Sequence, residues 1–120
     1  MARTLVVEDN ADSLKLFRAV LALRGHAVTG LSGGDELVAL VRKEPPDLIL
    51  LDVQLPGADG YQLLEQLRRE IPALPPVVAL TAHAMSGDRD RAMAAGFDGY
   101  LTKPIDVASF GQTVEGYLRR

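Results

Sequence analysis

Continuous runs of apolar residues in this chain end in acidic side chains. Leu5–Val7 is followed by Glu8 and Asp9, and Leu48–Leu51 is followed by Asp52. Runs that are continuously apolar, rather than alternating, are typical of strands in a parallel sheet that is buried on both faces. The pattern therefore predicts a parallel sheet with carboxylates at the strand ends.

Two later runs end in other polar groups. Val77–Leu80 is followed by Thr81, and Tyr100–Thr102 is followed by Lys103 and Pro104. In open parallel sheets the carboxyl ends of the strands line one crevice, where ligands bind. We therefore expect three carboxylates, a hydroxyl and an ammonium group to converge on one pocket that suits a divalent cation and a phosphoryl group.

Helical segments alternate with the strand-like runs. Apolar spacing and boundary signals predict helices at 11–24, between Asp35 and Pro45, at about 59–70, at 88–95 and from about 106. The apolar face of the last helix is expected to carry Val107, Phe110 and Val114, whereas His26 is expected at the surface. Strict alternation of strands and helices predicts an α/β, doubly wound three-layer sandwich.

Composition narrows the class of protein. The 120 residues fit one domain, and the net charge of -3 makes a general nucleic-acid-binding surface improbable. The chain has no cysteine, which excludes disulfides and thiolate metal sites. We find no apolar stretch of membrane-spanning length and no signal peptide, so we expect a soluble cytoplasmic protein.

The acidic residues suit a magnesium site. Mg²⁺ prefers hard oxygen ligands and keeps several waters, so a few carboxylates brought together by strand ends are sufficient. Glu8 and Asp9 alone could simply favour a helix start, but Asp52 lies at the floor of the predicted crevice. A carboxylate can also act as a nucleophile that forms an aspartyl-phosphate, with Lys103 neutralising phosphoryl oxygens.

Four motifs give the chain a family resemblance. Val-Glu-Asp-Asn, Leu-Asp-Val-Gln-Leu-Pro-Gly-Ala-Asp-Gly, Leu-Thr-Ala-His-Ala-Met and Tyr-Leu-Thr-Lys-Pro occur at 7–10, 51–60, 80–85 and 100–104. In this order they resemble the receiver domain of two-component response regulators, and most of all the single-domain regulators of the cell-division type. The resemblance covers the whole chain and implies a flavodoxin-like (βα)5 fold with strand order 2-1-3-4-5.

The resemblance also implies roles for individual residues. Asp52 corresponds to the phosphoacceptor, Thr81 and Tyr100 to the switch positions, and Lys103 to the phosphate-binding lysine. A cis peptide bond is implied before Pro104.

The implied magnesium ligands come from two segments. Asp9 and Asp52 correspond to direct ligands and the backbone carbonyl of Gln54 to a third, with Glu8 acting through water. Each of these assignments rests on the motif match.

The resemblance implies a phosphorelay protein rather than a conventional enzyme. A histidine kinase or histidine phosphotransferase would be the phosphoryl source. A downstream protein would bind the face formed by helix 88–95, strand 100–102 and the last helix. We expect residues 1–120 to be one complete receiver domain without an output domain, monomeric, with no direct contact to nucleic acid or membrane.

Two other functions use a related fold or chemistry. A haloacid-dehalogenase-type phosphatase also uses a strand-end aspartate with Mg²⁺, but it usually has an acid two residues later, where this chain has Gln54. A flavodoxin-like flavin carrier fits the fold, but the Glu8-Asp9 pair would repel the flavin phosphate.

Overall fold

The structure is a computed structural model that describes residues 3–55, 58–81, 88–103 and 105–118. Its main sheet has five strands in the order β2-β1-β3-β6-β7, and all neighbouring strands are parallel. The strands are β1 (Arg3–Val7), β2 (Ala27–Leu31), β3 (Leu48–Asp52), β6 (Val77–Thr81) and β7 (Gly99–Thr102). Counted along this sheet, the predicted strand order 2-1-3-4-5 is confirmed.

A small hairpin follows β3 and accounts for the two remaining strand labels. β4 (Gln54–Leu55) and β5 (Ala58–Asp59) pair in the antiparallel direction. The sequence predicted only a turn here, because strands of two residues leave no periodicity to detect. The hairpin returns the chain so that the next helix begins close to the end of β3.

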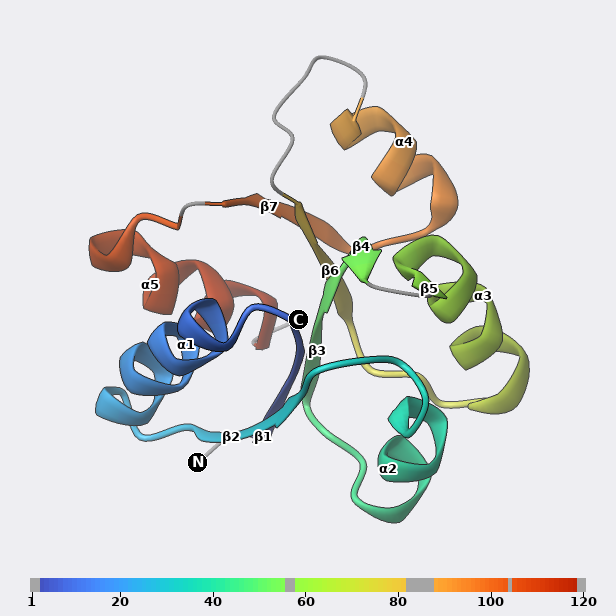
Figure 1. Cartoon of the computed structure of the whole chain (residues 1–120), viewed down its shortest axis with the longest axis horizontal. Coiled ribbons are helices and arrows are strands. Elements are labelled where there is room, and N and C mark those ends of the chain that lie inside the picture. Colours follow the sequence, from blue (N-terminus) through green and yellow to red (C-terminus); the bar gives the residue numbers. More distant parts are fainter. Residues whose placement is uncertain (1–2, 56–57, 82–87, 104, 119–120) are drawn as a thin grey trace.

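Five helices cover the two faces of the sheet in the described part of the chain. They are α1 (Ala11–Leu23), α2 (Leu37–Lys43), α3 (Gly60–Glu70), α4 (Asp88–Ala95) and α5 (Val107–Leu118). Helices α1 and α5 lie on one face, and α2, α3 and α4 lie on the other (Figure 1). The sandwich predicted from the alternation of strands and helices is therefore present.

Side-chain caps fix the starts of two helices that begin at the carboxyl edge of the sheet. The Asn10 side chain accepts a hydrogen bond of 3.0 Å from the Ser13 N–H at the start of α1. The Asp59 side chain accepts one of 2.7 Å from the Tyr61 N–H at the start of α3. Such caps satisfy backbone donors that have no partner within the helix. The two caps therefore favour helix starts directly after the loops at this edge.

The hydrophobic core is divided by the sheet into two clusters. One packs the face of α2, α3 and α4 and includes Leu37, Leu64 and Phe97. The other packs the face of α1 and α5, where the rings of Phe17 and Phe110 stack with centroids 5.2 Å apart. All five residues of β3 are buried, as expected for a central parallel strand. The sheet is therefore anchored on both faces beneath the strand ends.

The last helix departs from the sequence prediction at its first residue. Phe110 and Val114 are buried as predicted, but Val107 is 52% exposed. The first turn of α5 lies at the outer end of the helix, away from the sheet (Figure 1). Helical spacing places Val107 on the same side of the helix as Phe110 and Val114, but its position in the first turn leaves it exposed.

His26 was expected at the surface, but its side chain is only 12% exposed. Its Nε2 lies 2.9 Å from a carboxylate oxygen of Glu115, and Arg24 pairs with the other oxygen at 2.6 Å. Hydrogen bonds from Arg24 and from His26 lower the pKa of Glu115 to about 2. These three residues join the end of α1 to α5, a long-range contact that no local pattern indicates.

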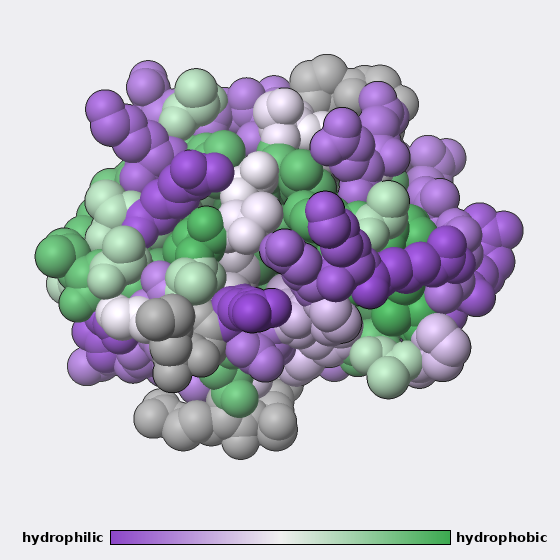
Figure 2. Space-filling model, turned by 90° about the horizontal axis from the view of Figure 1, so that it is seen from below, coloured by the Kyte–Doolittle hydropathy of each residue, from purple (hydrophilic) through white to green (hydrophobic). Residues whose placement is uncertain are grey.

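The visible surface around the β2 edge is largely hydrophilic. Seen from below the view of Figure 1, hydrophobic residues form small groups separated by hydrophilic ones (Figure 2). In the described part of the chain, none of the helices combines the length and the apolar character needed to cross a membrane.

The contrast between Phe110 and Val107 gives a stability prediction. Replacing Phe110 by alanine should lower the free energy of unfolding by about 3–5 kcal/mol, because it removes a buried ring together with its stacking contact to Phe17. Val107→Ala should change it by less than about 0.5 kcal/mol, since the side chain is exposed. Urea denaturation followed by circular dichroism measures both. A Val107→Ala loss as large as that of Phe110→Ala would contradict the described packing of α5.

Candidate functional site

The carboxyl edge of the sheet gathers the polar residues that the sequence singled out. Glu8 follows β1, Asp52 ends β3, Thr81 ends β6 and Lys103 follows β7. Glu8, Asp52 and Thr81 are all buried. The predicted convergence of strand-end side chains at one edge is therefore present.

Lys103 holds two of the carboxylates together. Its Nζ donates hydrogen bonds of 2.8 Å to Glu8 Oε1 and of 2.8 Å to Asp52 Oδ2. Its backbone N–H donates to the Thr81 carbonyl at 2.7 Å. The ammonium group thus bridges two buried acids, and the backbone of Lys103 is fixed by the residue that ends the neighbouring strand.

Three carboxylates are close enough to share a cation. Glu8, Asp9 and Asp52 each offer an oxygen, and these oxygens lie within 4.8 Å of one another. Glu8 and Asp52 are buried, whereas Asp9 is exposed. Hard carboxylate oxygens partly open to water are the donor set that Mg²⁺ prefers. The residues present therefore fit a magnesium ion.

The clustering of acids changes the protonation of Glu8. Burial, and then a hydrogen bond with Asp52, raise the pKa of Glu8 from 4.5 to about 7, against the opposing effect of Lys103. Burial alone would lower the pKa of Lys103, but its hydrogen bonds to Asp52 and Glu8 outweigh burial and raise the pKa. Two acids and one lysine leave negative charge in the pocket uncompensated, which favours either a proton or a cation.

Gly60 holds the other side of Asp52, and sequence reasoning did not single it out. A Cβ at Gly60 would lie 2.5 Å from Val53 Cα and 2.7 Å from the Asp52 carbonyl oxygen. The Gly60 N–H donates to the Val53 carbonyl at 3.2 Å. Only glycine allows α3 to begin this close to the peptide that carries Asp52 and leads to Gln54. The Asp-Gly pair at 59–60 was the available signal.

Tyr100, the expected switch residue, lies on β7 and packs against the cluster that contains α4. Its side chain is neither fully buried nor fully exposed. The implied cis peptide bond before Pro104 lies outside the described residues. The backbone of Gln54, the expected third magnesium ligand, lies in β4, two residues after Asp52.

Comparisons with known proteins all point to one family. A family model for the response regulator receiver domain matches residues 4–115. The polar-differentiation response regulator DivK of Brucella ovis is 39% identical over 116 residues, covering 95% of this chain and 94% of that protein. DivK of Brucella anthropi is 39% identical over 119 residues, with the same coverage.

Solved structures agree with the sequence comparisons. A response regulator receiver protein from Burkholderia phymatum is 35% identical, with a TM-score of 0.84 over 99% of this chain and 96% of that chain. The BeF3-activated N-terminal receiver domain of Klebsiella pneumoniae RstA is 29% identical, with a TM-score of 0.89 over 98% of this chain and 99% of that chain. These similarities confirm the flavodoxin-like fold class.

The raised pKa of Glu8 predicts a pH-dependent stability in magnesium-free buffer. The folded protein keeps the Glu8 proton up to about pH 7, whereas the unfolded chain releases it near 4.5. Because the folded state binds more protons in this interval, the free energy of unfolding should fall as pH rises from about 4.5 to about 7. Urea titrations across this range measure the fall.

The Glu8→Gln variant provides the control for this prediction. Glutamine keeps the shape of the protonated acid but cannot release a proton, so the variant should lose most of the fall in stability. An exposed-site control, Glu65→Gln on α3, should keep it, since Glu65 lies on the exposed side of that helix. A Glu8→Gln variant whose stability falls as steeply as that of the wild type would contradict the assignment.

Proposed function

Because the chain belongs to the response regulator receiver domain family, we propose that it takes a phosphoryl group onto Asp52 from a histidine kinase or histidine phosphotransferase. The observation that carries this assignment is the Lys103 ammonium at 2.8 Å from both Asp52 and Glu8. A nucleophilic carboxylate beside a fixed cation is an arrangement that favours phosphoryl transfer to an aspartate.

The transfer step uses the carboxylate of Asp52 as the nucleophile. One carboxylate oxygen forms a bond to phosphorus while the P–N bond of a phosphohistidine breaks, and the electron pair of that bond returns to the imidazole nitrogen. Lys103 then exchanges its carboxylate partner for a phosphoryl oxygen and neutralises its charge. The side chain of Asp52 is only 2% exposed, so the pocket excludes most water around the reacting group.

Glu8, Asp9 and Asp52, with the backbone carbonyl of Gln54, are the groups we assign to Mg²⁺. A magnesium ion held by these groups would supply positive charge that neutralises phosphoryl oxygens. Glu8 is fully buried and is already bonded to Lys103 at 2.8 Å. It therefore acts mainly by fixing the lysine and by adding negative charge to the pocket.

Thr81 and Tyr100 connect the pocket to the surface in this proposal. Phosphorylation adds about 1.5–2 negative charges and three acceptor oxygens at Asp52. The Thr81 hydroxyl turns to donate to one of these oxygens, and Tyr100 rotates into the space behind it. The face formed by α4, β7 and α5 then changes its shape, which biases binding of a downstream protein.

We further propose that residues 1–120 act as one receiver domain, monomeric and cytoplasmic, that signals by contact with a separate protein and not by binding nucleic acid. The match to DivK supports the single receiver domain, since the aligned region covers 94% of that protein. The domain is a signalling module whose own chemistry is limited to gaining and losing its phosphoryl group.

The two alternative functions find no support. A dehalogenase-type phosphatase usually has an acid two residues after its nucleophile, where this chain has Gln54. For a flavin carrier, the carboxylates of Glu8, Asp9 and Asp52 would repel the flavin phosphate.

The first functional prediction concerns phosphorylation. Acetyl phosphate should label the protein at Asp52 only when Mg²⁺ is present, and Asp52→Asn should abolish the label. Lys103→Ala should still accept phosphate, because the nucleophile remains, but should fail to switch. Mass spectrometry with peptide mapping measures the label, and Asp90→Asn on α4 is the matched control for a lost carboxylate. Undiminished labelling of Asp52→Asn would contradict the assignment of Asp52 as the phosphoacceptor.

The second functional prediction concerns the switch. Beryllofluoride with Mg²⁺, used as a phosphoryl mimic, should shift amide resonances of α4 and β7 in the wild type. Thr81→Ala and Tyr100→Ala should keep the shifts next to Asp52 but lose most of those in α4 and β7, because the pocket is intact and the coupling is not. Binding of the downstream protein should lose its phosphate dependence in parallel. If either variant kept the full pattern of shifts, the Thr81–Tyr100 coupling would be wrong.

A further inference from the structure

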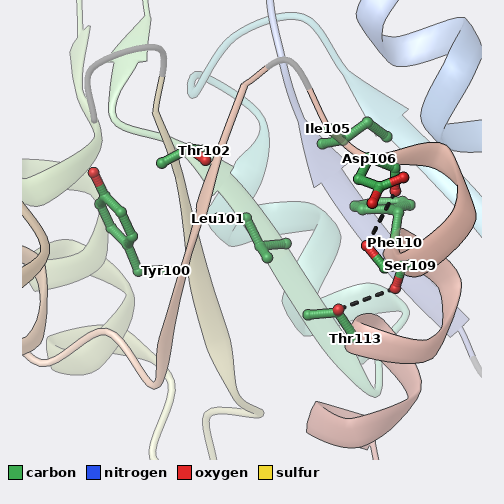
Figure 3. A pocket seen from close by; sticks show the side chains of 8 residues that line it. All are labelled: Tyr100, Leu101, Thr102, Ile105, Asp106, Ser109, Phe110 and Thr113. Atoms are coloured by element: carbon green, nitrogen blue, oxygen red, sulfur yellow. Dashed lines mark hydrogen bonds between the residues drawn. The ribbon is translucent and has the colours of Figure 1, made fainter.

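A hollow of about 290 Å³ lies between β7 and α5, beyond the acidic pocket. Figure 3 shows its two walls. Leu101 extends from β7 toward α5, whereas the ring of Tyr100 extends to the opposite side of the strand. The face that carries this hollow is the one assigned above to the downstream protein.

The inner part of the hollow is apolar. Leu101, Ile105 and Phe110 line it, and all three belong to the core cluster of the α1 and α5 face. Phe110 is buried and stacks on Phe17, so this wall is rigid. A guest in the hollow can therefore bury aliphatic groups against a fixed apolar surface.

The α5 side of the rim presents hydrogen-bond acceptors. The Thr113 hydroxyl donates to the Ser109 carbonyl at 3.0 Å, and the Ser109 hydroxyl donates to the Asp106 carbonyl at a longer 3.4 Å. Both hydroxyl hydrogens are thus directed along the helix, which leaves oxygen lone pairs for a guest (Figure 3). A guest that donates hydrogen bonds matches this side of the rim.

Asp106 gives the rim a negative charge. Its Oδ1 accepts a 3.0 Å hydrogen bond from the Ala108 N–H, and no ion pair links it to any residue in the described part of the chain. The other acid of this region, Glu115, is held by Arg24 and His26. The positive end of the α5 dipole amounts to about half a charge, which is less than the full charge of the carboxylate. The rim therefore favours a cation.

We propose that this hollow receives a lysine or arginine side chain from the downstream protein. Such a side chain has an aliphatic stem and a cationic donor at its tip. The stem would lie on Leu101, Ile105 and Phe110, and the tip would reach the Asp106 carboxylate. Acidic guests are repelled by Asp106, and purely apolar guests leave the carboxylate without a cationic partner. Only the identity of the partner as the downstream protein rests on the proposed function.

The test is a titration of the whole chain with small probes, followed by ¹H–¹⁵N correlation spectra. The probes are the N-acetyl N-methylamides of lysine, arginine and norleucine, together with methylammonium. Lysine and arginine probes should shift the amides of Leu101, Ser109 and Thr113. Norleucine has the stem without the charge and methylammonium the charge without the stem, so both should bind more weakly.

The Asp106→Asn variant distinguishes binding at the cation site from nonspecific binding. Asparagine caps helices about as well as aspartate, so α5 should stay intact, as circular dichroism can verify. This variant should bind the lysine probe up to about fivefold more weakly, the scale of an exposed ion pair. Glu65→Gln, a matched charge change on α3, should bind as the wild type does.

Three results would overturn the proposal: equal binding of norleucine and lysine probes, no dependence on Asp106, or no shifts in the hollow with any probe. Labelling of Asp52 by acetyl phosphate is measured on the same samples. If the wild type is not labelled, the proposed function fails while the titration still decides the chemistry of the hollow. If labelling occurs and the probes do not bind, only the present proposal fails.

Discussion

The shared ammonium group of Lys103 is the interaction on which the functional edge of this molecule depends. It bonds two buried carboxylates, those of Glu8 and Asp52, at 2.8 Å each. Two carboxylates this close in a buried setting repel one another strongly unless a cation or a proton intervenes. Because the Lys103 backbone is bonded to Thr81 at 2.7 Å, a change in the charge at Asp52 acts on the lysine and on the neighbouring strand end together. Asp52, Lys103 and the backbone of Thr81 thus form one connected unit.

A second connection leaves the same pocket through the backbone. Gly60 lies against the Asp52–Val53 peptide, and Tyr61 follows it in the first turn of α3. The Arg91 guanidinium of α4 lies 4.5 Å from the centre of the Tyr61 ring, and Tyr61 also meets Phe97 edge-on, with centroids 5.6 Å apart. A cation placed over an aromatic ring contributes about 0.5–1 kcal/mol at exposed sites. This matters for α4, because Ala92 is its only buried side chain among those described. The position of α4 therefore depends on few contacts, one of which begins next to Asp52.

The sequence predicts the sheet and the pocket because both follow from local patterns. Continuous apolar runs such as Leu48–Leu51 identify buried parallel strands, and topology then brings Glu8, Asp52 and Lys103 to one edge. Residue chemistry suggested the roles of Asp52 and Lys103, and the family resemblance supplied that of Thr81; all three roles stay a proposal. The β4–β5 hairpin was missed because two-residue strands have no period. The contact of His26 with Glu115 was missed because these residues are 89 positions apart. Val107 was misplaced because helical spacing does not reveal that a residue in the first turn stays exposed.

The two faces of the sheet differ in how firmly they hold their helices, and this difference decides which surface can respond. On one face, α5 is tied to α1 by the Phe17–Phe110 stack and by the bonds of Arg24 and His26 to Glu115. On the other face, α4 has one buried alanine and an exposed Arg91 to hold it. A disturbance that begins at Asp52 and reaches β7 should therefore displace α4 more easily than α5. We therefore expect movement to be concentrated at α4 and at Tyr100, and to be smaller at the α5 wall of the hollow. A partner that anchors a basic side chain in that hollow could then sense the moving half of the same face, so that one contact supplies affinity and the other supplies dependence on phosphorylation.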